Sequence, residues 1–313
     1  MDNDTLARLD ALTEFRCRAV DAAELLKMDL PPRENLLDPW LPAQGLAMIH
    51  AARGTGKTHV SLGIAYAVAS GGSFLGWHAE RPRGVLFIDG EMPANALQER
   101  LAAIVASAET SRTAPLRIIT PDLQPYGMPD LASEQGQRVI DEFIDETIDL
   151  IVVDNLSTLV RSGKENEAES WQPVQTWALR LRAQGKSVLF VHHSGKGGQQ
   201  RGTSRREDVL DTVIALKRPP DYVPEDGAAF EIHFEKARGF HGEDVAPVEA
   251  KLTTDDRGKQ VWVTKTREAS TLERVAALLS EGLSQKDVAI ELGINKSNVS
   301  RHARKARAEG LIG

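Results

Sequence analysis

Residues 45–70, GLAMIHAARGTGKTHVSLGIAYAVAS, decide the fold, because they predict a buried strand, a glycine-rich loop and a helix in direct succession. Gly54 and Gly56 let the loop backbone curl so that its N–H groups point to one centre, which the N-terminal end of the helix also faces. Lys57 adds a point charge for the β- and γ-phosphates of ATP, and the Thr58 hydroxyl is placed to ligate Mg²⁺. The predicted nucleotide-binding residues are Ala52, Arg53, Gly54, Thr55, Gly56, Lys57, Thr58 and His59.

One position of this loop departs from the strict phosphate-loop pattern. Ala51 stands where the pattern G-x-x-x-x-G-K-[ST] has its first glycine, and alanine is small enough for the turn to survive. A Gly-Lys-Thr triplet also occurs by chance in loops. Here, however, an apolar strand ends at the loop and an apolar helix begins after it, as a phosphate loop requires.

Length and composition set limits on the class of protein. The 313 residues exceed one average domain and predict a large core with a small appendage. The chain carries 38 Lys and Arg against 45 Asp and Glu, a net charge of −7, so it has no general basic field and any contact with DNA must be local. The lone Cys17 cannot form an internal disulfide, and no apolar run approaches the roughly 20 residues that span a bilayer. Because the N-terminus is also unlike a signal peptide, we expect a cytoplasmic protein without membrane contact.

Short apolar runs alternate with helical segments after the phosphate loop. The predicted strands cover residues 84–92, 116–120, 149–155, 186–194 and 211–218, and the predicted helices cover 93–108, 133–147 and 168–184. This alternation predicts an α/β fold with a mostly parallel sheet that is buried on both faces. After residue 218, three alternating segments without intervening helices predict antiparallel edge strands.

We expect three regions: a helical N-terminal arm at residues 1–36, a core at 37–265, and a small all-α domain at 266–313 that follows a polar linker at 265–270. Apolar residues at helical spacing, followed by Pro31 and Pro32, indicate the arm. The arm either packs on its own core or docks on a neighbouring subunit.

Two acidic residues follow different predicted strands, at the edge of a parallel sheet where ligands gather. Asp154 ends the run DLIVVD and is expected to hold Mg²⁺ through water. Glu91, in FIDGEM, is placed to orient and deprotonate an attacking water, unless it only complements a helix dipole. Asp89 and Asp149 have a simpler interpretation as polar residues at strand ends.

The motifs AARGTGKT, FIDGEM, DLIVVDN and FVHHSGKGG followed by RGTS resemble RecA-like hexameric motor ATPases, and most closely the plasmid RepA-type replicative helicases. The resemblance covers residues 37–265. It implies a RecA-like P-loop core that assembles into a ring, with ATP between subunits and Glu91 as catalytic base. It also implies that His192 or His193 is the sensor of the γ-phosphate; a strand-end histidine without this role is the alternative for either ring.

The glycine-rich segment 193–206 contains four cations and no acid, which suits contact with a phosphate backbone. In the resembling family this loop faces the central channel, and it is the first candidate for binding single-stranded DNA. A solvated surface loop is the alternative, and a second candidate is the segment with Arg161 and Lys164. Because only 5% of the residues are aromatic, backbone tracking fits better than base stacking. The four cations are Lys196, Arg201, Arg205 and Arg206.

Hydrolysis at a subunit boundary usually needs a cation from the neighbouring subunit, because charge accumulates on the transferred phosphoryl group. Lys236 and Arg238, in EKARG, share a strand face and resemble the Lys and Arg pair that ring helicases donate. Arg201, in RGTS, matches the arginine of the plasmid-type branch and is the second choice. For Lys236, an ion pair with Glu231 or Glu235 is the alternative.

Residues 271–313 have the pattern of a helix-turn-helix. Ser284 is expected to cap the second helix, Gly293 to end it, and Asn295 to cap the third. The third helix carries five basic residues and no acid, which favours binding to duplex DNA over the alternative of a protein-docking module. Ser297, Asn298 and Arg301 are predicted at the major groove, with Arg304, Lys305 and the other later cations at phosphates.

The leading hypothesis is a hexameric, ring-forming ATPase that moves on DNA, a replicative helicase of a plasmid or another mobile element that uses ATP and Mg²⁺. The alternative is a DNA-binding regulator in which ATP switches assembly. A small-molecule kinase is the weakest hypothesis, because the sequence shows no acceptor site and the basic C-terminal helix would stay unexplained.

Overall fold

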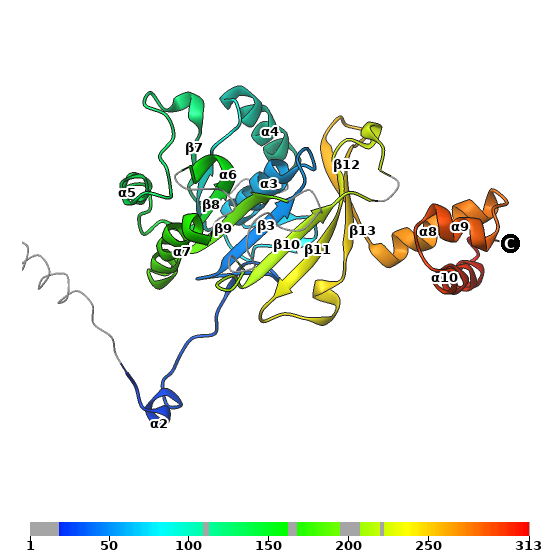
Figure 1. Cartoon of the computed structure of the whole chain (residues 1–313), viewed down its shortest axis with the longest axis horizontal. Coiled ribbons are helices and arrows are strands. Elements are labelled where there is room, and N and C mark those ends of the chain that lie inside the picture. Colours follow the sequence, from blue (N-terminus) through cyan, green and yellow to red (C-terminus); the bar gives the residue numbers. More distant parts are fainter. Residues whose placement is uncertain (1–18, 109–112, 162–167, 195–206, 220–221, 313) are drawn as a thin grey trace, which may run out of the picture. The chain divides into compact units, whose positions relative to one another are not determined.

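The computed structural model describes residues 19–108, 113–161, 168–194, 207–219 and 222–312. The contacts divide the chain into two units, Met1–Arg33 and Glu34–Gly313. In the described part of the first unit, Asp21 caps the short helix α2 (Ala22–Leu25) by accepting a hydrogen bond from the backbone N–H of Ala23 (Figure 1). This helix lies within the arm predicted at residues 1–36, and residues 1–18 of the arm, with Cys17, lie outside the described residues.

The second unit is built on a nine-stranded sheet in the order β13-β12-β11-β10-β3-β9-β8-β6-β7 (Figure 1). The strands from β10 to β7 in this order are parallel. Three antiparallel strands extend the sheet beyond β10, as the sequence predicts. In chain order the strands are β3 (Leu46–Ala51), β6 (Gly84–Asp89), β7 (Leu116–Ile119), β8 (Ile148–Asp154), β9 (Ser187–His193), β10 (Thr212–Lys217), β11 (Ala229–Ala237), β12 (Val248–Thr254) and β13 (Gln260–Thr266).

Helices cover both faces of the parallel part, because alternate side chains of each buried strand point to opposite faces. In β3, Ala47 and Ile49 face the core cluster that contains α3 (Lys57–Ser70) and α4 (Ala94–Ser107). Leu46 and Met48 face the cluster with α5 (Glu134–Asp141), α6 (Leu156–Leu159) and α7 (Ala168–Ala183). The prediction of a mixed α/β fold around a mostly parallel sheet is confirmed.

Short elements complete the core. β1 (Asn35–Leu37) pairs with β2 (Leu41–Pro42), and β4 (Ser73–Phe74) pairs with β5 (Trp77–His78). In the described ranges, 3-10 helices lie in loops at η1 (Pro121–Leu123), η3 (Pro224–Asp226) and η4 (Gly242–Val245).

The helix predicted over residues 133–147 ends earlier, at Asp141. The side chain of Asp145 accepts hydrogen bonds from the Thr147 backbone N–H at 2.9 Å and from its hydroxyl at 2.5 Å. Such local side-chain bonds compete with helical backbone bonds, so a turn replaces the last predicted helical turns.

The prediction of a polar linker at residues 265–270 is wrong. β13 runs to Thr266 and α8 (Arg267–Ser280) begins at the next residue, so no linker separates them. α9 (Gln285–Glu291) and α10 (Lys296–Ala308) follow, and Ser284 and Asn295 cap them as predicted. The three helices share a small core of Val275, Val288, Val299 and Ala303.

Among the described residues, no helix has the length and apolar character needed to cross a membrane.

Candidate functional site

The phosphate loop lies between β3 and α3, in the geometry that its glycines require. Gly54 has φ 74° and Gly56 has φ 105°, left-handed values that other residues rarely adopt. Gly56 precedes α3 and contributes no side chain to cap it, so the first N–H groups of the helix stay open to an anion.

Lys57 is the first residue of α3, and its side chain folds back over the loop. Its Nζ donates hydrogen bonds to the carbonyl oxygens of Ala51 at 3.1 Å and Ala52 at 2.9 Å. Burial lowers the pKa of the ammonium, and the carboxylates of Asp154 and Glu91 offset part of this effect. A buried cation that its surroundings only partly compensate suits a phosphate ligand.

Asp154 ends β8 and is completely enclosed, within reach of the first turns of α3. Its Oδ2 accepts a hydrogen bond of 2.7 Å from Ser61 Oγ, and the Thr58 hydroxyl bonds to the same carboxylate. Burial raises the pKa of Asp154 to about 6, although both hydroxyls lower it. A carboxylate that burial destabilises gains from a nearby cation, and oxygen donors are the ligands that Mg²⁺ prefers.

The donor set therefore fits Mg²⁺ bound mainly through phosphate and water. Thr58 and Asp154 are the residues that would hold the ion. Within the described ranges, no group of three or more His, Cys, Asp or Glu could hold a metal alone. Mg²⁺ usually keeps several waters and takes only one or two protein carboxylates in phosphate-transfer sites.

Glu91 lies beside this pair, because β6 and β8 are neighbours and Asp89 pairs with Asp154 in register. Asp89 is buried and accepts hydrogen bonds from the backbone N–H groups of Glu91 and Met92, which fixes the turn. Its role as a structural strand-end residue agrees with the sequence interpretation. The Glu91 side chain is 58% exposed, so a carboxylate faces solvent at the edge of the sheet.

Asn155 positions the Glu91 carboxylate. Its Nδ2 donates a hydrogen bond of 2.6 Å to Glu91 Oε2, and the asparagine itself is buried. Asn155 is not among the site residues predicted from the sequence. Its position directly after Asp154 is the only signal that could have indicated a role.

The two histidines at the end of β9 face different groups. Residues adjacent in a strand point to opposite faces, and the register places His192 beside His50 and His193 beside Ala51. His193 Nε2 lies 3.9 Å from Glu91 Oε2. The geometry therefore favours His193 over His192 as the residue next to the predicted catalytic base.

His59 and Arg218 extend the site. The His59 ring packs edge-on against Trp262 of β13 at 5.5 Å, and burial with the nearby Arg100 lowers the pKa of His59 to about 4. Arg218 was not predicted as a site residue; it donates a hydrogen bond of 3.4 Å to the Gly54 carbonyl and stacks on Tyr222. Ser61 was also missed, although it lies one helical turn after Thr58.

Lys236 and Arg238 reach the same segment before β10. Lys236 Nζ donates to the carbonyl of Glu207, and Arg238 donates to the carbonyl of Asp208 at 3.2 Å. Burial and the neighbouring Arg238 lower the pKa of Lys236. The structure thus brings the two cations together, and their action on a neighbouring subunit stays a prediction.

The alternative ion pair of Lys236 with Glu231 or Glu235 is not formed. Glu231 contacts His233 and Arg267, and Glu235 contacts His50 and Lys217. Arg161, which belongs to the second candidate segment for contact with single-stranded DNA, donates to the carbonyl of Met128. The predicted residues Lys164, Lys196, Arg201, Arg205 and Arg206 lie outside the described residues.

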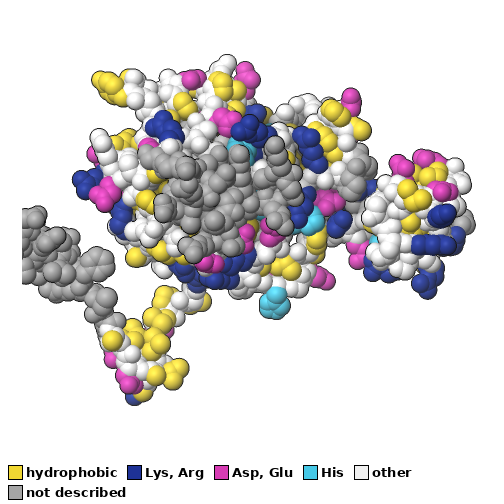
Figure 2. All heavy atoms as spheres, viewed as in Figure 1, with side chains coloured by type: hydrophobic (Ala, Val, Ile, Leu, Met, Phe, Trp, Pro, Cys, Tyr) yellow, Lys and Arg dark blue, Asp and Glu magenta, His cyan; other side chains and the backbone are white. Residues whose placement is uncertain are grey.

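α10 presents its predicted DNA-binding residues at the surface. Ser297, Arg301, Arg304 and Lys305 are exposed and Asn298 is half-buried. Lys and Arg side chains gather over the C-terminal helices on the right of Figure 2. One of these cations, Lys305, is paired with Glu268 at 3.5 Å.

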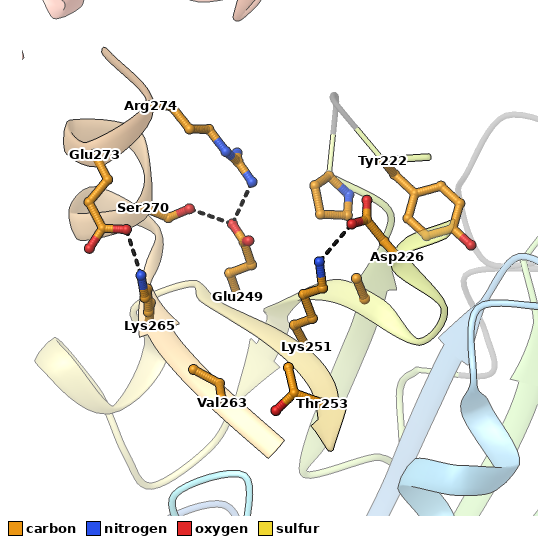
Figure 3. A pocket seen from close by; sticks show the side chains of 12 residues that line it. Tyr222, Asp226, Glu249, Lys251, Thr253, Val263, Lys265, Ser270, Glu273 and Arg274 are labelled. Carbon is orange, nitrogen blue, oxygen red and sulfur yellow. Dashed lines mark hydrogen bonds and ion pairs between the residues drawn. The ribbon is translucent and has the colours of Figure 1, made fainter. Parts of the chain in front are cut away.

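The C-terminal helices are joined to the sheet by ion pairs around a pocket of about 360 Å³ (Figure 3). Glu249 of β12 accepts hydrogen bonds from Ser270 at 2.6 Å and Arg274 at 2.8 Å. Lys265 pairs with Glu273 at 2.6 Å. These contacts attach α8 to the sheet.

Comparison with known proteins agrees with this geometry. A family model described as AAA domain matches residues 11–199, which include the phosphate loop, Glu91, Asp154 and both histidines. The chain belongs to the AAA domain family. No curated protein matches the sequence.

The fold of this AAA-domain protein is similar to that of a KaiC-like protein from the hyperthermophilic archaeon Pyrococcus horikoshii. The TM-score is 0.52 at 15% identity, with 74% of this chain and 94% of the other covered. The family and the fold together identify a RecA-like P-loop ATPase, which implies nucleotide binding and hydrolysis, usually with Mg²⁺.

Proposed function

We propose that this AAA-domain protein is an ATP-driven DNA motor that assembles as a ring, a replicative helicase of a plasmid or another mobile element. One observation carries the proposal: Lys57, Asp154 and Glu91 meet at one edge of the sheet, in a chain that also presents the basic helix α10. The first group suits hydrolysis of a nucleotide, and the second suits contact with a phosphate backbone.

The residues divide the reaction between them. Lys57 and the loop N–H groups bind the phosphates, and Mg²⁺ held by Thr58 and Asp154 would neutralise developing charge. Glu91 accepts a proton from water as the water oxygen bonds to the γ-phosphorus and the bond to the β–γ bridging oxygen breaks. Asn155 occupies Glu91 Oε2, which leaves Oε1 for that water.

The proposed partners are DNA and further copies of the same chain. In a hexamer, Arg238 and Lys236 of one subunit would act on ATP bound by the next, with Arg201 as the second choice. Single-stranded DNA would contact the segment with Lys196, Arg205 and Arg206, and duplex DNA would contact α10.

A DNA-binding regulator is the second candidate, and one observation favours it. Because β13 continues directly into α8 and Glu249 holds that helix, the DNA-binding helices would follow movements of the ATPase sheet. ATP could then switch DNA affinity without translocation.

One preparation tests both functions. We would measure phosphate release with and without a single-stranded oligonucleotide, together with separation of a fluorescently labelled fork, using Glu91→Gln as the matched control. A motor shows stimulation by single-stranded DNA and unwinding that Glu91→Gln lacks. Hydrolysis without unwinding, with duplex binding that depends on nucleotide, would instead support the regulator. Absence of nucleotide binding would overturn both.

A further inference from the structure

His50 is a buried histidine in the otherwise apolar strand β3, one residue before Ala51 and the phosphate loop. It is fully buried, and both ring nitrogens have partners. Nδ1 lies 2.9 Å from Ser194 Oγ, and Nε2 lies 2.9 Å from Glu235 Oε2. A polar group is buried at a cost unless it is hydrogen-bonded, so these two contacts hold the ring in one orientation.

A β-bulge directs Glu235 toward His50. In the pairing of β10 with β11, Val213 faces Lys236 and the next residue, Ile214, faces Phe234. Glu235 is therefore the extra residue of the bulge, and bulges re-aim side chains, often beside active sites.

The Glu235 carboxylate is ionised at neutral pH. Burial alone would raise its pKa, but hydrogen bonds from His50 and Lys217 lower it. Because a carboxylate only accepts, the Nε2 of His50 is the donor. The contact is thus a charge-assisted hydrogen bond, which is stronger and shorter than a neutral one.

The partners of His50 adjoin the other candidate functional residues. Ser194 directly follows His193, which lies beside Glu91. Glu235 directly precedes Lys236. One imidazole therefore connects the strand before the phosphate loop with the ends of β9 and β11, which reach it from 144 and 185 residues away in sequence.

We propose that His50 is a positioning residue that couples the phosphate loop to β11, so that nucleotide binding at the loop sets the position of Glu235 and the adjoining Lys236. The proposal rests on the proposed function, because it requires that the loop binds ATP. It gives His50 a role separate from those of His192 and His193.

Two substitutions separate the two contacts. His50→Gln places an amide near Nε2 and keeps the bond to Glu235. His50→Asn places an amide near Nδ1 and keeps only the bond to Ser194. His78→Asn is the matched control, since His78 Nδ1 bonds to Ser73 Oγ at 3.1 Å in the separate β4–β5 pair.

Hydrogen–deuterium exchange would be measured on peptides covering residues 46–60 and 229–238, with and without Mg²⁺ and a non-hydrolysable ATP analogue. Steady-state hydrolysis would be measured on the same proteins. In the wild type and His78→Asn, the analogue slows exchange in both peptides. In His50→Asn it slows exchange only in residues 46–60, and kcat falls about tenfold while KM changes less than about twofold. In His50→Gln, the slowed exchange in residues 229–238 and the wild-type kcat should both return.

Melting temperatures are recorded first, and Glu235→Leu removes the acceptor from the other side if His50→Asn does not fold. In Glu235→Leu, as in His50→Asn, the ATP analogue should no longer slow exchange in residues 229–238. Protection of residues 46–60 without any change in 229–238 of the wild type would overturn the coupling, as would equal behaviour of His50→Asn and the wild type. Protection in neither peptide would refute nucleotide binding itself, and the coupling with it.

Discussion

Asp154→Asn should stabilise the nucleotide-free protein at neutral pH while it impairs the Mg²⁺-dependent reaction. Burial raises the pKa of Asp154 from its ordinary 3.8 to about 6, so the ionised carboxylate is unfavourable in the folded state. Asparagine has nearly the same shape, can still accept the Ser61 hydrogen bond and carries no charge. The substitution removes the cost of the buried charge.

The magnitude follows from the two pKa values. A difference of about 2 corresponds to about 3 kcal/mol at 1.36 kcal/mol for each pKa unit. The folded state binds the proton of Asp154 more tightly than the unfolded state does. The contribution of this carboxyl group to the free energy of unfolding is therefore fully present below about pH 4 and is lost as the pH rises through about 6. The advantage of Asp154→Asn should therefore be near zero at about pH 4 and reach its maximum above about pH 7.

Urea unfolding of both proteins between pH 4.5 and 8 measures this difference. Asp149→Asn is the control, because Asp149 is partly exposed and pairs with Arg83 at 3.2 Å, so its removal should not stabilise the protein. Mg²⁺-dependent ATP hydrolysis is measured in parallel and should fall in Asp154→Asn. A mutant that is less stable than the wild type at pH 7.5, or an advantage that does not change with pH, would refute the assignment of Asp154 as a buried, destabilised carboxylate.

Three further outcomes are expected. Lys57→Ala should abolish binding of a fluorescent ATP analogue, whereas Glu91→Gln should bind it and release phosphate at least about 100-fold more slowly; wild-type turnover by Glu91→Gln would reject the base. Arg238→Ala should hydrolyse ATP slowly, and activity should recover when it is mixed with Glu91→Gln, because some subunit interfaces then combine an intact Glu91 with an intact Arg238. Light scattering must first show that each mutant assembles. Mixed rings that stay inactive would make Arg201 the next residue to test. Glu249→Gln should lower the free energy of unfolding by about 1 kcal/mol in urea titrations, since Arg274 loses a half-buried partner; no salt dependence of this loss would contradict an ionic cause.

The sheet could be predicted from sequence because its strands are continuous apolar runs. The predicted run 149–155 corresponds to Ile148–Asp154, and 186–194 corresponds to Ser187–His193. The linker prediction failed for a physical reason. Its polar residues are the contacts that attach α8 to the sheet: Arg267 reaches Glu231 at 3.4 Å, and Ser270 bonds to Glu249.

The candidate site, too, could be predicted from the sequence only in part. The phosphate loop could be predicted because its glycines, Lys57 and Thr58 are consecutive and act through local geometry. Asn155 and His50 could not, because their partners are distant in sequence: Glu91 is 64 residues from Asn155 and Glu235 is 185 residues from His50. Those pairings depend on strand order and on a bulge, which hydrophobic periodicity does not specify.

The antiparallel edge gives the C-terminal helices a direct physical connection to the phosphate loop. Trp262 of β13 packs against His59, the residue after Thr58, and also against Phe230 at 5.2 Å. Four residues later β13 ends at Thr266, and α8 begins. Ser107, at the end of α4, also donates a hydrogen bond of 2.6 Å to the carbonyl of Gln260, the first residue of β13. α3 follows the phosphate loop and α4 follows Glu91. β13 therefore contacts the two helices that begin at the candidate site, and it does so before it reaches α8. Truncations designed to separate the proposed ATPase and DNA-binding activities should therefore end after Thr266, so that Trp262 and the edge of the sheet stay in place.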